Sequence, residues 1–362
     1  MKKKKIILPL ILLSTLFVTT SCTKTLTKVV IDRSKEVEVS EITSTITELY
    51  QDLSKSCVGI RGLNSTSSAS GSGVVYKEAN GTYYVVTNEH VISDMTSLYI
   101  YLGDEVYVEA TLVGSDATND IAVLTFNKDL VPTTREIKVH TFMTDMESVI
   151  NVGQTTLAIG CPLSLTTNYN YLTTGVVASI QDTFVLTDAS LNPGNSGGGL
   201  FDLNGNLIGI VEKKETYTTT TSGQIPVSGF GYAISLDIVK KAITDIEANG
   251  NITRPVIGIT TTIINPLIST QVTEAYKYYL PTDDKAYIVV TEVTEGSNAE
   301  NSGILANDVI LKVDDEEIST LTQISKVLHK KLIGDTIKLT IVRTASATDN
   351  TKTELEITIN LK

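Results

Sequence analysis

Cysteine and histidine are scarce in this chain, which has three of each among 362 residues. No two cysteines have the C-x-x-C spacing of a metal or redox motif, so the sequence predicts neither a metal site nor a disulfide framework. No cofactor is expected. Cys57 and Cys161 fall in different predicted strands. Buried free thiols are the expected state of both, and a bridge between them is the alternative.

Basic residues are also in short supply, because 29 Lys and Arg stand against 41 Asp and Glu. The formal net charge is -12, and the part of the chain beyond the basic N-terminal segment is more negative still. An acidic chain of this kind is a poor candidate for nucleic-acid binding. No nucleic-acid partner is therefore expected.

The N-terminus lacks a hydrophobic run long enough to span a membrane. Lys2 to Lys5 are basic, and the apolar stretch 6–18 that follows is shorter than the roughly 20 residues of a spanning helix. This arrangement is typical of a secretory signal peptide, which we place at residues 1–21. Export is the consequence, and polar residues 22–40 are expected to form a tether.

Cys22 follows the small residues Thr19, Thr20 and Ser21, and this segment resembles the lipobox of bacterial lipoproteins. The resemblance implies a diacylated Cys22, although Thr19 stands where lipoproteins usually have an aliphatic residue. Two acyl chains attach a protein stably to a membrane, since each buried CH₂ contributes about 0.8 kcal/mol. We expect a membrane-anchored lipoprotein that faces outside the cytoplasm, and an uncleaved signal anchor is the alternative.

Helical periodicity is rare between residues 54 and 234, whereas short apolar segments bounded by turn residues are frequent. Asn80-Gly81 and Asn204-Gly205 predict hairpin turns between such segments. A dozen short strands favour an all-β barrel or sandwich. Helices over 41–53 and from Ser235 to Asn249 complete a first domain at 41–250. The expected strands are 57–61, 73–76, 83–87, 97–102, 106–113, 121–126, 156–159, 175–180, 183–187, 199–202, 207–211 and 230–234.

The pattern changes after a short linker at Asn251 to Pro255. Strands then alternate with helices over residues 255–362, which predicts one small α/β domain. The expected strands are 256–260, 287–293, 308–313, 337–343 and 355–361, and the expected helices are 271–280, 298–302 and 321–332.

A glycine-rich stretch at residues 194–198 (Gly-Asn-Ser-Gly-Gly) holds one hydroxyl, that of Ser196. A flexible turn between two strands is the simplest interpretation of such a stretch. The stretch also matches G-x-S-x-G, the nucleophile elbow of α/β-hydrolases. That interpretation requires a helix directly after the serine, whereas Gly199 to Val211 is expected to form a strand, a turn and a second strand. It is therefore rejected.

A nucleophilic serine needs a base and a group that orients the base. The histidines are His90, His140 and His329, and His90 follows a predicted strand. Asp120 opens another strand, whereas Asp116 is the competing carboxylate and is expected to be a turn residue. The chain order His90, Asp120, Ser196 is the order of chymotrypsin-like proteases, while the α/β-hydrolase order would need His329 as the base.

Residues 55 to about 345 resemble the HtrA (DegP-like) serine proteases, which have a chymotrypsin-like double β-barrel domain and a C-terminal PDZ domain. Leu186 and Cys161 replace the Gln and Asn that are common in the family. The segments that carry the resemblance include Gly71-Ser72-Gly73-Val74-Val75, Thr87-Asn88-Glu89-His90-Val91, Asn119-Asp120-Ile121-Ala122-Val123-Leu124, Asn192-Pro193-Gly194-Asn195-Ser196-Gly197-Gly198 and Gly229-Phe230-Gly231-Tyr232-Ala233-Ile234.

The resemblance implies a role for each matched residue. Ser196 is the implied nucleophile, His90 the general base and acid, and Asp120 the group that fixes the imidazole tautomer. The backbone at Gly194, Asn195 and Ser196 is expected to form the oxyanion hole. The implied substrate-binding strand pairs with the substrate backbone and lines a pocket for small aliphatic side chains; its residues are Phe230, Gly231, Tyr232 and Ala233.

In the second domain, a run of four residues resembles the carboxylate-binding loop of an HtrA-type PDZ domain, although an ordinary strand is the alternative. The run is Val256, Ile257, Gly258 and Ile259. Asn298 and Asn307 replace residues that are Pro and Gly in the family. The implied mechanism is β-augmentation by a peptide C-terminus. The periodic residues Leu321, Ile324 and Leu328 belong either to the groove or to the core.

We therefore expect a serine endopeptidase that cleaves unfolded or damaged exported proteins. The family implies a homotrimer, and the glycines of the serine loop allow a formed and a collapsed oxyanion hole. A catalytically silent peptide-binding or chaperone lipoprotein is the alternative.

Overall fold

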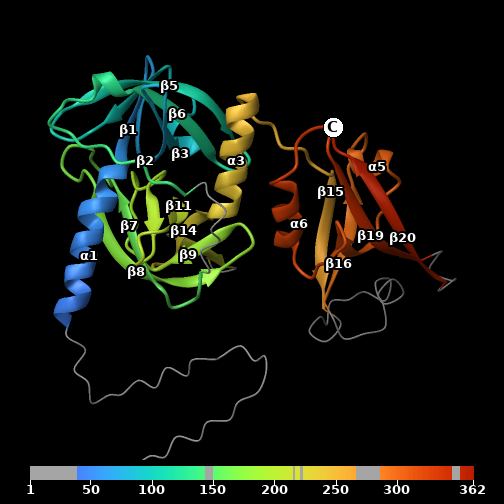
Figure 1. Cartoon of the computed structure of the whole chain (residues 1–362). Helices are drawn as coiled ribbons and strands as arrows, with labels where there is room; N and C mark the ends of the chain where they lie inside the picture. The colour runs from blue at the N-terminus through green and yellow to red at the C-terminus, as the bar shows by residue number, and fades with distance from the viewer. Residues whose placement is uncertain (1–38, 143–149, 215–216, 221–222, 266–285, 345–350) are drawn as a thin grey trace, which may run out of the picture. The chain divides into compact units, whose positions relative to one another are not determined.

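The computed structural model describes residues 39–142, 150–214, 217–220, 223–265, 286–344 and 351–362 (Figure 1). The predicted signal peptide, Cys22 and the predicted helix 271–280 lie outside these residues. Within the described part of the chain, no helix is long and apolar enough to cross a membrane.

Two closed antiparallel barrels of six strands each begin the fold (Figure 1). Every one of their strands overlaps a predicted strand, which confirms the double-barrel prediction. The first barrel has the order β1-β2-β3-β6-β5-β4 and contains β1 (Cys57–Leu63), β2 (Ser68–Ala79), β3 (Thr82–Thr87), β4 (Ser97–Tyr101), β5 (Tyr107–Asp116) and β6 (Ile121–Asn127). The second has the order β10-β11-β14-β9-β8-β7 and contains β7 (Thr155–Gly160), β8 (Tyr171–Ile180), β9 (Phe184–Thr187), β10 (Gly199–Phe201), β11 (Leu207–Lys214) and β14 (Gly231–Ser235).

The hairpin between β2 and β3 turns at Asn80 and Gly81, whose φ angles are 53° and 76°. Two successive positive φ angles match the twist of the flanking strands, which explains the Asn-Gly pair. A further hairpin, β12 (Tyr217–Thr220) with β13 (Gly223–Pro226), was not predicted. Its Thr-rich sequence has no apolar alternation that would mark it as a strand pair.

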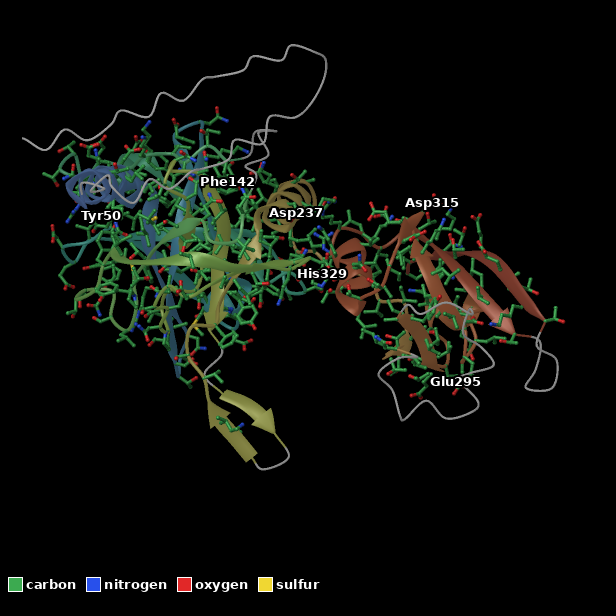
Figure 2. The ribbon with its side chains drawn as sticks, turned by 90° about the horizontal axis from the view of Figure 1, so that it is seen from below. Tyr50, Phe142, Asp237, Glu295, Asp315 and His329 are labelled. Atoms are coloured by element: carbon green, nitrogen blue, oxygen red, sulfur yellow. The ribbon has the colours of Figure 1, made fainter. Side chains whose placement is uncertain are left out.

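Each barrel has its own apolar interior, and a third cluster joins strands of both barrels to helix α3 (Leu236–Asn249). α3 follows Ser235 as predicted and ends at Gly250, which has a φ of 77°. Helix α1 (Val39–Leu53) contributes Leu53 to the same cluster. Tyr50 of α1 and Phe142 also pack there and are labelled in Figure 2.

Cys57 and Cys161 are both buried and both unbonded, as predicted. Burial raises the pKa of the Cys161 thiol to about 11 and also raises that of Cys57. Both thiols are therefore neutral packing groups near pH 7.

The second domain is an antiparallel sheet of order β15-β16-β17-β19-β20, and its described residues also include two short helices. The first strand starts at Ile259, three residues later than predicted, and the second helix ends at 328 instead of 332. Ile324 is buried and Leu328 packs against the same core, whereas Leu321 is exposed. The elements are β15 (Ile259–Ile264), β16 (Tyr287–Val293), α5 (Asn298–Asn301), β17 (Val309–Val313), β18 (Glu316–Glu317), α6 (Leu321–Leu328), β19 (Thr336–Thr344) and β20 (Lys352–Asn360).

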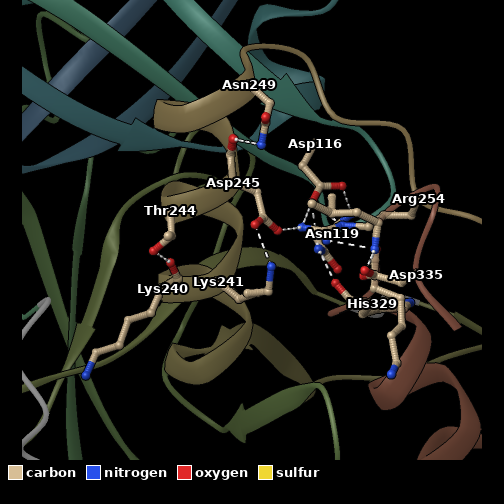
Figure 3. Close-up of polar contacts among 12 residues, drawn as sticks. Asp116, Asn119, Lys240, Lys241, Thr244, Asp245, Asn249, Arg254, His329 and Asp335 are labelled. Carbon is tan, nitrogen blue, oxygen red and sulfur yellow. Dashed lines mark hydrogen bonds and ion pairs between the residues drawn. The ribbon is translucent and has the colours of Figure 1, made fainter. Parts of the chain in front are cut away.

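Arg254, in the segment before the second domain, is a buried cation held by two buried carboxylates (Figure 3). Its Nη2 lies 2.6 Å from Asp116 Oδ2 and 2.8 Å from Asp245 Oδ2, and its Nε donates to Asp116 at 2.8 Å. Asn119 also donates to Asp116, at 2.7 Å. Asp116 is therefore the buried last residue of β5, and the prediction that it occupies a turn in a loop is wrong.

Candidate active site

His90 and Asp120 are joined by two hydrogen bonds and lie at the same end of the neighbouring strands β3 and β6. His90 lies in the one-turn helix α2 (Glu89–Ile92), directly after β3. Asp120, whose φ is 51°, precedes β6. Its Oδ1 accepts from the His90 backbone N–H at 2.9 Å, and its Oδ2 lies 2.8 Å from His90 Nδ1. One carboxylate thus fixes both the helix start and the imidazole ring.

The imidazole is half-exposed, since 50% of the His90 side chain is accessible against 20% for Asp120. The hydrogen bond that Asp120 accepts from His90 is the main factor that raises the pKa of His90, while burial opposes the rise. The charges of Asp120, Glu212 and Glu89 raise the pKa further. The arrangement therefore favours a protonated imidazole more than water does.

Ser196 lies in the connection between β9 and β10, and the first barrel holds this connection in place. The backbone N–H of Ser72 donates to the Ser196 carbonyl at 2.8 Å. Gly197 has a φ of 85°, and a Cβ there would lie 2.1 Å from the Ser72 carbonyl oxygen. Only glycine fits that position, so the glycine that follows the serine is a requirement of the close approach.

The peptide between Pro193 and Gly194 has a defined orientation. The Pro193 carbonyl accepts from the Leu163 N–H at 2.7 Å, and the Gly194 carbonyl accepts from Ser72 Oγ at 2.7 Å. In a trans peptide the carbonyl and the N–H point in opposite directions. The Gly194 N–H therefore points away from Leu163. Leu163 has a φ of 65° and lies in a turn in which the Ser164 N–H donates to the Pro162 carbonyl.

The Ser196 hydroxyl donates to the Glu212 carbonyl at 2.9 Å rather than to His90. Sequence reasoning missed Glu212, because the predicted strand ended at Val211. The available signal was an acidic residue at the end of an apolar strand that follows the serine loop.

The predicted substrate-binding residues divide into two groups. Gly231, Tyr232 and Ala233 lie in β14, which pairs with β9 along one edge and with β11 along the other. Because both edges are taken, these three residues have no backbone edge to offer a substrate, and the predicted pairing is not available to them. Phe230 lies outside the strand and is 47% exposed.

The predicted PDZ loop has one side occupied. The carbonyls of Val256, Ile257 and Gly258 accept hydrogen bonds from Asn298 Nδ2, the Ala299 N–H and the Thr294 N–H. Gly258 has a φ of 86°, and a Cβ there would lie 2.3 Å from the Cβ of Ser297. Strand β15 lies at the edge of its sheet, with β16 as its neighbour.

No group of three or more His, Cys, Asp and Glu side chains in the described residues is arranged to hold a metal ion. Burial lowers the pKa of the other two histidines, His140 and His329. His140 accepts from the Leu207 N–H, and the His329 carbonyl accepts from Asn119. Neither is placed near Ser196 by any of these contacts.

Two barrels with a His–Asp pair on one and a serine in a glycine-rich loop on the other, followed by a sheet-and-helix domain, define a chymotrypsin-fold serine protease with a PDZ domain. Residues 71–210 match the trypsin-like peptidase domain family, and residues 255–359 match the PDZ domain family.

The chain belongs to the HtrA family of serine proteases, as its sequence predicted. It is 36% identical over 300 residues to the serine protease Do-like HtrA of Lactococcus lactis subsp. cremoris, covering 79% of this chain and 70% of the relative. It is 31% identical to a probable periplasmic serine endoprotease DegP-like of Chlamydia trachomatis, covering 72% of this chain and 49% of the relative. A solved structure of the HtrA-type protease AlgW with a tripeptide superposes with a TM-score of 0.65 at 26% identity, covering 87% of this chain and 96% of that one.

Proposed function

We propose that Ser196, His90 and Asp120 are the catalytic residues of this HtrA-type endoprotease. Ser196 attacks the scissile carbonyl, and His90 accepts its proton and later donates it to the leaving amine. The two hydrogen bonds that Asp120 accepts from His90 carry the proposal, because they fix the tautomer whose Nε2 is the proton acceptor. The proposed role requires the Ser196 hydroxyl to leave the Glu212 carbonyl and turn to His90, by rotation about its Cα–Cβ bond.

The backbone N–H groups of Gly194 and Ser196, with Asn195 between them, form the proposed oxyanion hole. The orientation of the Pro193 carbonyl toward Leu163 supports this role, since it turns the Gly194 N–H to the other side. Loss of one such donor costs about 10²- to 10³-fold in rate in related chemistry. The proposed lining of the specificity pocket is Phe230, Gly231, Tyr232 and Ala233, of which Phe230 is half-exposed.

The proposal is tested with a fluorophosphonate probe, in which the nucleophilic oxygen displaces fluoride from phosphorus. We expect the full chain to be labelled on Ser196 alone, as located by peptide mass spectrometry. The exposed Ser190 lies six residues away and serves as an internal control. Absence of a Ser196 adduct would contradict the proposal and favour the catalytically silent peptide-binding alternative.

The PDZ domain is proposed to bind peptide C-termini beside β15, with the carboxylate at the N–H groups of Val256 to Ile259. Two observations support this site: β15 is an edge strand of the described sheet, and the loop carbonyls accept hydrogen bonds from Thr294, Asn298 and Ala299. A charge-assisted hydrogen bond contributes about 1.5–3 kcal/mol, so amidation of the peptide is expected to weaken binding roughly 10- to 100-fold. Calorimetry with a free and an amidated peptide measures this, and equal affinities would rule out the carboxylate site.

The natural substrates are proposed to be unfolded or damaged proteins outside the cytoplasm, with the protease attached to the membrane through a diacylated Cys22. Cys22→Ala is then expected to leave the membrane fraction, whereas continued attachment favours a signal anchor.

A homotrimer is also proposed. The support is an exposed apolar pocket lined by Leu63, Tyr107 and Leu163, the last of which is 73% exposed. Sedimentation equilibrium tests it, and a monomeric mass at micromolar concentration would contradict it.

A further inference from the structure

Glu212, at the end of β11 in the second barrel, acts on both members of the Ser–His pair. Its carbonyl accepts from Ser196 Oγ at 2.9 Å, and its carboxylate is one of three that act electrostatically on His90. The others, Asp120 and Glu89, belong to the first barrel and to α2.

A β-bulge gives Glu212 its position. The pairing of β11 with β14 passes from Val211 opposite Ala233 to Lys213 opposite Tyr232, so Glu212 is the extra residue of the bulge. A bulge redirects a side chain relative to the regular alternation of a strand. This one lies beside the proposed nucleophile.

Neighbouring backbone contacts fix the bulge against the serine loop. The Gly197 N–H donates to the Val211 carbonyl at 2.8 Å, and the Val211 N–H donates to the Gly198 carbonyl at 2.9 Å. The backbone next to Glu212 is thus hydrogen-bonded to the two residues that follow Ser196, which couples the positions of Glu212 and Ser196. Its Oε2 is buried, and a carboxylate in such a place interacts with nearby charges more strongly than it does in water.

We propose that Glu212 is a positioning residue of the protease site, held by the β11 bulge beside Ser196, whose carboxylate stabilises the imidazolium form of His90 together with Asp120. This inference rests on the proposed roles of Ser196 and His90. The imidazolium forms when His90 takes the Ser196 proton, so a second carboxylate assists that step. In the free enzyme the same carboxylate has the opposite effect. It keeps His90 protonated at mildly acidic pH, although only the neutral form of His90 can accept the serine proton.

The raised pKa of His90 sets the sign of the effect. Activity falls as the pH drops through that pKa, because the protonated imidazole cannot accept the serine proton. Glu212→Gln removes one of the charges that raise it. The acidic limb of the kcat/KM profile is therefore expected to move to lower pH, and the plateau at higher pH to fall, because a less basic His90 is a weaker proton acceptor. A merely structural role would lower kcat/KM equally at every pH.

A measurement that needs no turnover separates this inference from the proposed function. The chain has three histidines, and burial lowers the pKa of His140 to about 4 and that of His329 as well, so the His90 titration stands apart. In the full chain carrying Ser196→Ala, adding Glu212→Gln is expected to lower the His90 pKa in an NMR titration. The His140 and His329 titrations are expected to stay in place.

Glu89→Gln is the matched control, since Glu89 lies next to His90 in sequence and is the last of its three electrostatic contributors. Its shift is expected to be smaller than that of Glu212→Gln, and Glu212→Asp is expected to restore most of the wild-type value. If Glu212→Gln does not fold, Glu212→Ser supplies the same reading. An unchanged His90 pKa, or an equal shift in Glu89→Gln, overturns the proposal. A lowered pKa in a protein whose Ser196 takes no probe upholds it and contradicts the proposed function instead.

Discussion

Ser196→Ala is expected to lower kcat/KM on an unfolded protein substrate by on the order of 10⁶-fold, the loss found when a serine protease loses its nucleophile. Alanine keeps the backbone N–H groups of the proposed oxyanion hole but has no oxygen to attack the carbonyl. The residual rate would then come from binding and the oxyanion hole alone. Release of peptides from an unfolded, fluorescently labelled protein measures the effect.

The matched control for this variant is Ser190→Ala, at an exposed serine of the same connection, which is expected to retain wild-type activity. Ser196→Ala also loses the hydrogen bond to the Glu212 carbonyl, a change of about 1 kcal/mol in the free energy of unfolding. Circular dichroism therefore distinguishes inactivity from unfolding. Activity within tenfold of wild type would mean that another residue is the nucleophile.

The barrels and the His–Asp–Ser arrangement were predictable because each depends on a local signal. Twelve short apolar segments with turn residues between them suffice to predict the strands, and Asn80-Gly81 carries its own turn geometry. The chain order of His90, Asp120 and Ser196 excluded the competing hydrolase fold. The chain order does not predict the two hydrogen bonds between His90 and Asp120. They depend on two loops that meet only in the folded barrel.

The features that escaped prediction depend on pairing between segments distant in sequence. Glu212 is the extra residue of a bulge that is defined only by the pairing of β11 with β14. Both edges of β14 are paired, and the sequence does not specify that β9 and β11 are its neighbours. Asp116 was predicted to be a turn residue because its partner Arg254 lies 138 residues away. A buried carboxylate and a turn carboxylate have the same local sequence, so only the fold separates them.

Asp120→Asn is expected to lower kcat by about 10⁴-fold, as loss of the triad carboxylate does in related proteases. The amide can present its NH₂ group to His90, which then turns its acceptor nitrogen toward residue 120 and away from Ser196. The variant also removes the main cause of the raised His90 pKa, so that pKa is expected to fall. Stopped-flow or steady-state kinetics and the NMR titration of His90 measure the two effects in the same protein.

Asp116→Asn is the informative partner of this variant, because Asp116 is the other carboxylate that sequence reasoning considered. It contacts Arg254 and Asn119, so its replacement leaves a buried guanidinium short of one counter-charge. Breaking a buried ion pair in this way costs about 3–5 kcal/mol of stability. Asp116→Asn is therefore expected to lower the denaturation midpoint while the folded fraction keeps its kcat, and Asp120→Asn to do the reverse. The exchanged pattern, with kcat lost at 116 and kept at 120, would assign the orienting role to Asp116. The two variants therefore separate two roles of carboxylates that lie four residues apart. Asp116 binds Arg254 of the linker to the barrel, and Asp120 orients the base His90.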